Sequence, residues 1–179
     1  MMLCITTNPT KSVAEPIEFS PRKITPFHPS VALGARGDTV ISLQQWLNRY
    51  VGPIETDGVF GPVTEFTVRT FQYRMFLPTS GVADPQTWDA LMLGMPLGLP
   101  LLHLGSQCTH VRWAQAILDA LGFYTEAIDG NFGFHTQTAV RRYQVSREFQ
   151  DADGVVNDTT WATLARDRIQ FYNPYYLKP

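Results

Sequence analysis

The sequence has few cysteines and no long hydrophobic run. Cys4 and Cys108 are its only cysteines, too few for a disulfide framework, although they leave room for a single bridge. The apolar run in residues 1–5 is too short for the core of a signal peptide, and no stretch reaches the roughly 20 apolar residues of a membrane span. We therefore expect synthesis in the cytoplasm, no insertion into a membrane, and no export by the usual secretory route.

Excess charge of one sign is also missing. The chain carries a net charge of −2, and residues 33–92 and 103–165 each contain more acidic than basic residues. A domain that binds DNA or RNA needs a basic face. Nucleic acid is therefore not an expected partner.

What the sequence does contain is one motif written twice. Asp-Gly, a spacer, Phe-Gly, two spacers and Thr occupy residues 57–64 and recur at residues 129–136, an offset of 72. The match continues outward in the same order, pairing Leu33 with Leu104, Val40 with Val111, Leu47 with Leu118, Val68 with Val140, Phe71-Gln72 with Tyr143-Gln144, Trp88 with Trp161 and Leu91 with Leu164. This is an internal duplication. Each copy is so small, at roughly 60 residues, that we expect it to pack on the other copy or on the flanking segments.

The duplication divides the chain into five segments: a proline-rich arm (1–30), a first repeat (31–92), an apolar linker (93–101), a second repeat (102–165) and an aromatic tail (166–179). Proline at this density favours extended chain, so the arm is either a disordered leader or a strip laid on a partner or on the repeats. The linker is too apolar for a solvated spacer, and we expect it to pack and to fix the repeats as a pair. The tail either covers a core face or contacts another molecule.

Hydrophobic spacing predicts three helices in each repeat, and hence a mainly α fold. Pro62 fits the first position of a second helix, because the amide hydrogen that proline lacks has no partner there. The side chains expected to face inward or partly inward in the first repeat are Val40, Leu43, Leu47, Tyr50, Phe66, Val68, Phe71, Met75, Trp88 and Leu91. The residues expected to cap helix N-termini are Asp38, Asp84, Thr109 and Asp158.

The order and spacing of these motifs resemble the peptidoglycan-binding domain of the helical, PGBD-1-like type. The resemblance covers residues 31–92 and 102–165, with the leucine-glycine start, the Asp-Gly-x-Phe-Gly turn, the aromatic-Gln pair and the closing Trp in each. It implies two compact three-helix units with Asp-Gly turns, which act as targeting modules for murein and are not themselves catalytic. The second copy departs from the pattern at Cys108, Ala114, Phe134 and Glu148-Phe149. These departures suggest that it keeps the fold while binding less well than the first copy, or not at all.

An enzymatic activity is not expected, because the repeats consume most of the chain. A glycosidase needs two carboxylates that flank one cleft. Asp57 and Asp129 belong to different repeats, and each is explained by its turn, where Asp tolerates a positive φ and Gly adopts one freely.

A metal site is not expected either, and no cofactor is implied. A zinc site needs three or four ligands at characteristic spacing. The candidate ligands in the second repeat are His103, Cys108, His110 and His135. Their order matches none of the usual zinc motifs.

The candidate ligand-binding residues lie beside the shared turn. They are Asp57, Phe60, Thr64 and Gln72 in the first repeat and Asp129, Phe132, Thr136 and Gln144 in the second. The two phenylalanines are either core plugs or platforms that stack on a sugar, and the threonines bond to the local backbone or contact a muropeptide. The two glutamines are expected at a helix edge, as solvated surface residues or as ligand contacts. The free amides at the start of the second helix could meet a stem-peptide carboxylate.

The leading functional hypothesis is therefore non-catalytic binding of cell-wall peptidoglycan through two tandem modules. Because no secretory signal is found, contact with the wall would follow lysis, assembly into a particle or export by a non-classical route. The alternative is a structural or adaptor subunit of a larger assembly, such as a phage tail or a contractile injection apparatus. In that alternative the repeats serve as scaffold, and the arm and tail dock on protein partners.

Overall fold

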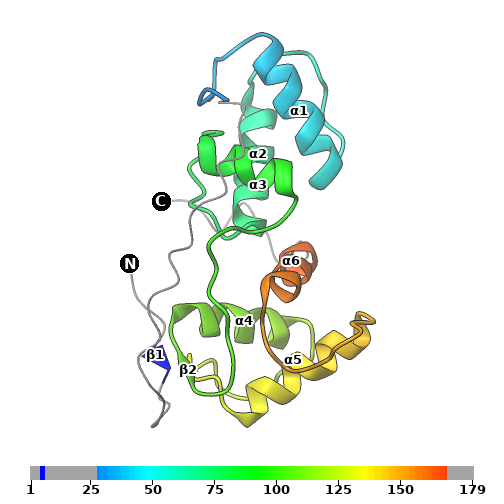
Figure 1. The fold of residues 1–179 in the computed structure, drawn as a ribbon. Helices are drawn as coiled ribbons and strands as arrows, with labels where there is room; N and C mark the ends of the chain where they lie inside the picture. Colours follow the sequence, from blue (N-terminus) through cyan, green and yellow to red (C-terminus); the bar gives the residue numbers. More distant parts are fainter. Residues whose placement is uncertain (1–4, 7–27, 169–179) are drawn as a thin grey trace. The chain divides into compact units, whose positions relative to one another are not determined.

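The structure is a computed structural model that describes residues 5–6 and 28–168 (Figure 1). In these residues the elements follow one another as β1 (Ile5–Thr6), α1 (Asp38–Tyr50), α2 (Pro62–Arg74), α3 (Pro85–Leu93), β2 (Ser106–Gln107), α4 (Thr109–Ala120), α5 (Phe134–Ser146) and α6 (Asp158–Asp167). The expected mainly α fold with three helices per repeat is confirmed. No helix in the described part of the chain is long and apolar enough to cross a membrane.

The described residues form two compact units, each built around one repeat. One unit contains residues 28–97 and 165–168, and the other contains residues 5–6 and 98–164. The division falls inside the expected linker, residues 93–101. That the linker fixes the repeats as a pair stays a prediction, as do the other segment boundaries.

The N-termini of the helices lie close to the predicted positions. Asp84 caps α3 as expected, because its Oδ1 accepts a hydrogen bond from the Thr87 amide at 2.8 Å. At three other helices the predicted cap is one residue too late, since Gly37, Cys108 and Asn157 stand before Asp38, Thr109 and Asp158. For Asp38 and Asp158 the physical reason is that aspartate favours both the cap and the first turn of a helix, where its charge meets the positive end of the helix dipole.

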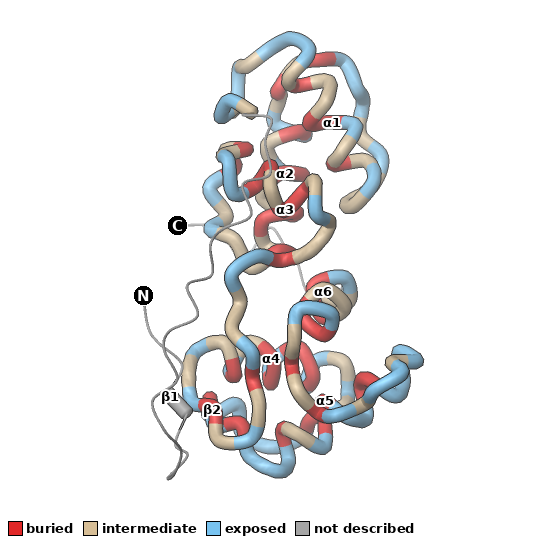
Figure 2. Tube along the Cα trace, viewed as in Figure 1, coloured by how far each residue is buried: buried red, intermediate tan, exposed pale blue. Residues whose placement is uncertain are grey.

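The three helices of each repeat bury one face in a core of that repeat (Figure 2). Side chains with at most 1% exposure include Val40, Leu43, Leu47, Val68, Phe71 and Trp88 in the first repeat and Val111, Ala114, Leu118, Val140, Tyr143 and Trp161 in the second. Phe66 corrects the prediction, because 43% of it is exposed. It stands two residues from both Thr64 and Val68, which are buried, and two residues along a helix turn a side chain to the opposite face.

The closing tryptophan of each repeat holds the segment that precedes the repeat. Trp88 donates its indole N–H to the Pro29 carbonyl at 3.3 Å, and Trp161 donates to the Pro100 carbonyl at 2.9 Å. His28 stacks on Trp88 with ring centroids 4.3 Å apart. Residues 28–30 of the expected arm therefore belong to the first repeat.

A short β pairing lies at the start of the second repeat. Ile5 of β1 stands opposite Gln107 of β2, and Thr6 stands opposite Ser106, in antiparallel register. Cys108, which follows β2, is disulfide-bonded. Cys4 and the remainder of the predicted arm lie outside the described residues, and so does the predicted tail beyond residue 168.

The second helix of each repeat ends in a left-handed residue that is not glycine. Phe76 and Glu148 both have φ of 58°. In each case the next residue donates its amide back to a glutamine carbonyl, Leu77 to Gln72 and Phe149 to Gln144, at 2.9 and 3.1 Å. This closing turn usually carries glycine, because a Cβ is strained at positive φ.

Candidate functional site

Four buried glutamines organise the loops of the two repeats. Gln44, Gln72, Gln115 and Gln144 are each at most 1% exposed. Each side chain accepts a hydrogen bond from a glycine amide and donates to the carbonyl of the residue after that glycine. Each one also donates to a threonine hydroxyl. A buried primary amide is costly unless its donors and acceptor are satisfied, and here the partners come from a loop and from the threonine of the helix that follows it.

The first network of each repeat joins the first helix to the Asp-Gly turn. Gln44 accepts from the Gly58 amide at 2.9 Å and donates to Asp57 Oδ1 at 2.8 Å. Gln115 accepts from the Gly130 amide at 2.9 Å and donates to Asp129 Oδ1 at 2.9 Å. The remaining acceptors are Val59 O and Thr64 Oγ1 in the first repeat, and Asn131 O, Thr136 Oγ1 and Tyr124 OH in the second.

The second network joins the middle helix of each repeat to the turn before the third helix. Gln72 accepts from the Gly81 amide at 2.9 Å, and Gln144 accepts from the Gly154 amide at 2.8 Å. Their side-chain amides donate to Val82 O, Thr87 Oγ1 and Ser80 Oγ, and to Val155 O, Thr160 Oγ1 and Asp153 Oδ1, respectively. The expectation that Gln72 and Gln144 are solvated at a helix edge is wrong, because both are buried.

The Asp-Gly turns depend on the carboxylates in a way that the sequence analysis did not foresee. Gly58 and Gly130 adopt positive φ, 69° and 81°, but the two aspartates do not. Among the described residues other than glycine, only Phe76 and Glu148 have a positive φ. Each aspartate instead accepts a hydrogen bond from the backbone amide two residues later: Asp57 from Val59, and Asp129 from Asn131. The carboxylate therefore closes the turn as a hydrogen-bond acceptor.

These hydrogen bonds lower the pKa of both carboxyl groups. The bond from the Gln115 side chain, followed by the bonds from Asn131, lowers the pKa of Asp129 from 3.8 to about 2. The bond from Gln44, followed by the Val59 amide, lowers the pKa of Asp57 as well. Both groups are ionised at neutral pH, and each belongs to its own repeat. They do not form a carboxylate pair.

The other predicted site residues are mainly internal. Phe60 and Phe132 are each 1% exposed, and they fill the core as plugs. Thr64 and Thr136 are 4% and 1% exposed, and each donates to the carbonyl of the residue after its Asp-Gly pair. Contact between a ligand and any of the eight predicted residues stays a prediction.

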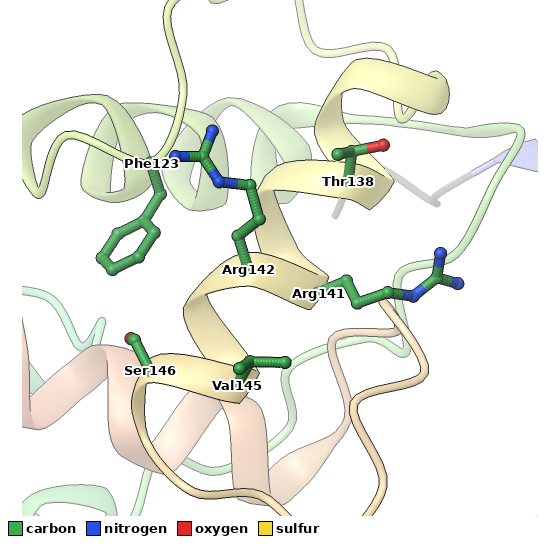
Figure 3. A pocket seen from close by; sticks show the side chains of 6 residues that line it. All are labelled: Phe123, Thr138, Arg141, Arg142, Val145 and Ser146. Atoms are coloured by element: carbon green, nitrogen blue, oxygen red, sulfur yellow. The ribbon is translucent and has the colours of Figure 1, made fainter.

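A hollow on the surface of the second repeat lies between the end of α4 and the outer face of α5 (Figure 3). Gly122, with φ of 78°, follows the C-cap of α4, and the next residue, Phe123, packs edge-on against Tyr143 with ring centroids 5.5 Å apart. The hollow has a volume of about 410 Å³ and is lined by Phe123, Thr138, Arg141, Arg142, Val145 and Ser146. Thr138, Arg142 and Ser146 are spaced by four residues, so they stack on one side of α5.

A second, smaller hollow of about 130 Å³ continues along the same helix. Phe123, Thr138 and Arg142 line both hollows, and Glu126 and His135 line only the smaller one. We call the two together the α5 groove. It runs from His135 to Ser146, a length of about 16 Å at the helical rise per residue.

The two arginines of the α5 groove differ in their hydrogen bonding. Arg141 donates to the Ala152 and Asp153 carbonyls at 3.2 and 3.1 Å, so its position is fixed by the neighbouring loop. Arg142 is exposed, and its guanidinium makes no hydrogen bond or ion pair with another described residue. In Figure 3 Arg142 reaches from α5 toward Phe123, while Arg141 points to the other side of the helix.

The first repeat has no cation at the position of Arg142. Its counterpart, 72 residues earlier, is Thr70, which is 6% exposed and donates to the Phe66 carbonyl at 2.9 Å. The counterpart of Arg141 is Arg69, which is paired with Glu65 at 2.8 Å. The cationic groove is therefore a property of the second repeat.

The residues of the α5 groove are not among those predicted from the sequence. A signal was present, because Thr70 of the first copy is replaced by the cation Arg142 in the second, between flanking positions that keep their character, Arg69 with Arg141 and Phe71-Gln72 with Tyr143-Gln144. Arginine on the outer face of a helix is ordinarily a solvated residue. Its proximity to Phe123 depends on the loop after α4, which the helical pattern does not define.

No metal cluster is formed by the residues that the structure describes. Groups of three or more His, Cys, Asp and Glu that could hold an ion do not occur among residues 5–6 and 28–168. The shifted carboxylates Asp57 and Asp129 are accounted for by their glutamines.

The chain is similar to several known proteins. It is 34% identical over 112 residues to the N-acetylmuramoyl-L-alanine amidase CwlM of Mycobacterium tuberculosis, an alignment that covers 59% of this chain and 27% of that protein. The chain thus matches about a quarter of the length of this curated relative. Among solved structures, the SleB N-terminal domain is 34% identical, with a TM-score of 0.35 and coverage of 37% of this chain and 93% of that one. The Burkholderia AP3 phage endolysin is 28% identical, with a TM-score of 0.38 and coverage of 50% and 33%.

The family model described as "Putative peptidoglycan binding domain" matches the sequence twice. The matches span residues 36–91 and 109–164, one in each repeat, and together they cover more than half of the chain. The chain therefore belongs to the family of peptidoglycan binding domains.

Proposed function

We propose that this protein binds bacterial peptidoglycan through its helical repeats and does not cleave it. The double family match, one for each repeat, is the observation that carries the proposal. The similarity to a protein named as an N-acetylmuramoyl-L-alanine amidase adds support, because that name refers to a bond of peptidoglycan.

The chemistry of the described residues agrees with a binding role. The carboxylates with lowered pKa, Asp57 and Asp129, each hold a glutamine inside one repeat. A general acid is expected to have a raised pKa, whereas these two groups stay ionised and act as acceptors. This use of the two acidic groups supports the proposed binding role.

Co-sedimentation of the purified protein with insoluble sacculi tests the proposal. We expect the protein to pellet with sacculi and to stay in the supernatant with chitin, which has a related glycan but no peptide. Muropeptide release by the bound protein would contradict the non-catalytic part of the proposal. Failure to pellet with sacculi would contradict the proposal as a whole.

The alternative role as a structural or adaptor subunit stays a prediction. Its docking strips would be the arm and the tail, and most of both lies outside the described residues. The same holds for wall contact after lysis, particle assembly or non-classical export.

A further inference from the structure

We propose that the α5 groove of the second repeat binds the peptide stem of peptidoglycan, with Arg142 as the partner of a stem carboxylate. This inference rests on the proposed function and deepens it, because it assigns the contact to one repeat and to one part of the polymer. It also reverses the expectation that the second copy is the weaker binder.

The first argument is the unpaired charge of Arg142. Its guanidinium is exposed and has no described partner, while the neighbouring Arg141 is fixed by two backbone carbonyls. Arginine presents several donors in a fork that matches the two oxygens of a carboxylate. A free carboxylate is therefore the complementary group for this end of the groove.

The second argument is the apolar surface beside that charge. Val145 is 64% exposed, and Phe123 presents a ring that is held edge-on by Tyr143. A ligand with small apolar side chains next to a carboxylate would bury this surface. Peptide stems, which contain alanine residues and free carboxylates, combine the two properties.

The third argument is length. The α5 groove extends about 16 Å along the helix, which corresponds to about five residues of extended chain. Glu126 and His135 line the end away from Val145. The acidic Glu126 disfavours a uniformly anionic chain such as a polyphosphate, so the groove fits a peptide with mixed groups better than a polyanion.

The test is a chemical-shift titration of the full chain with three soluble probes. They are a disaccharide that carries its peptide stem, the same disaccharide without the stem, and the first probe with its stem carboxylates amidated. We expect the first probe to shift the amides of residues 123–126 and 135–146, and not those of residues 62–74 in the first repeat. The other two probes should leave both sets in place.

Two matched variants complete the test. Arg142→Gln should weaken binding of the stem-bearing probe by about tenfold, because a hydrogen bond to a charged group is lost. Arg166→Gln removes the same charge from an exposed arginine that lines neither hollow, and should leave the affinity unchanged. Both variants should keep the thermal unfolding midpoint of the wild type.

The outcomes separate this inference from the proposed function. If the wild type pellets with sacculi but the α5 groove does not respond to the stem-bearing probe, the inference is wrong and peptidoglycan binding stands. Equal shifts with the stem-free disaccharide would also overturn it, since the glycan would then be the ligand.

Discussion

Glu148 adopts a strained left-handed backbone conformation, and its substitution can separate the cost of that strain from the contribution of side-chain packing. Its φ of 58° is unfavourable for a residue with a Cβ, and its side chain is exposed. The equivalent Phe76 has the same φ, but its ring lies 4.5 Å from the guanidinium of Arg168 and packs on the first core. The strain is offset by packing at Phe76 and not at Glu148.

Glu148→Gly is therefore expected to stabilise the second repeat. A left-handed residue costs about 1–2 kcal/mol, and the additional chain entropy of glycine takes back about 0.5–1 kcal/mol. The predicted gain in unfolding free energy is about 0.5–1 kcal/mol, measured by urea denaturation. Phe76→Gly is the matched control and should destabilise the protein. A loss of stability in Glu148→Gly would refute the account of this turn.

The lowered pKa of Asp129 predicts how the stability of the second repeat changes in acid. Its pKa in the folded protein, about 2, lies below the ordinary 3.8, so the ionised carboxylate stabilises the fold. This contribution is complete above pH 3.8 and is lost as the pH falls toward 2. Because the group is exposed to solvent, we expect a loss on the order of 1 kcal/mol.

Asp129→Asn should remove that pH dependence from the second repeat. Thermal unfolding of the wild type and the variant between pH 5 and pH 2, roughly the range over which carboxyl groups titrate, measures the difference. The two curves should converge at the acid end. Parallel curves over the whole range would show that Asp129 has an ordinary pKa in the folded protein.

Gln115 tests whether the glutamine networks hold the loops. Gln115→Ala leaves the buried Gly130 amide without its acceptor, and a buried unsatisfied donor costs about 1–3 kcal/mol. Hydrogen exchange at the amides of residues 128–136 should accelerate, while exchange in the first repeat stays unchanged. Gln107→Ala, at an exposed position of β2, is the control. Unaltered protection in Gln115→Ala would assign the turn geometry to the backbone alone.

At the scale of elements, the duplication and the helical spacing carry most of the fold. Val40, Leu47 and Trp88 could be placed in a core because their intervals match one helix face. Gln44 and Gln115 could not be recognised as buried, since a helical glutamine is normally solvated and its partners arrive from a loop 14 or 15 residues later. Arg142 could not be recognised as a groove residue for the same reason, because the groove exists only where the loop after α4 places Phe123 beside this arginine.

The pairing of β1 with β2 predicts a disulfide. Ile5 lies opposite Gln107 and Thr6 opposite Ser106, so the sequence neighbours of Cys4 and Cys108, Ile5 and Gln107, pair with each other. Cys108 is disulfide-bonded and Cys4 is the only other cysteine in the sequence. We predict an intrachain bond between them, which would hold β1 on β2.

Thiol titration in denaturant measures this directly. The oxidised protein should show no free thiol before reduction and two after it, and peptide mapping without reductant should recover residues 4 and 108 in one linked species. Free thiols in the oxidised protein, or a covalent dimer, would contradict the assignment.

At the scale of the whole molecule, the two repeats share a fold and differ in surface chemistry. Both close their loops with the same glutamine networks, but among the described residues only the second presents, along its middle helix, an arginine without a described partner beside an aromatic ring. Two equivalent modules would raise affinity by engaging the wall together. One competent groove per chain would instead bind a soluble fragment at a single site, without a gain in affinity from the other repeat.

Calorimetric titration of the full chain with a soluble, stem-bearing disaccharide tests the central claim most directly. The account predicts saturable binding with one site per chain, weakened about tenfold by Arg142→Gln. Two equal sites per chain, or an affinity that does not change in Arg142→Gln, would contradict it.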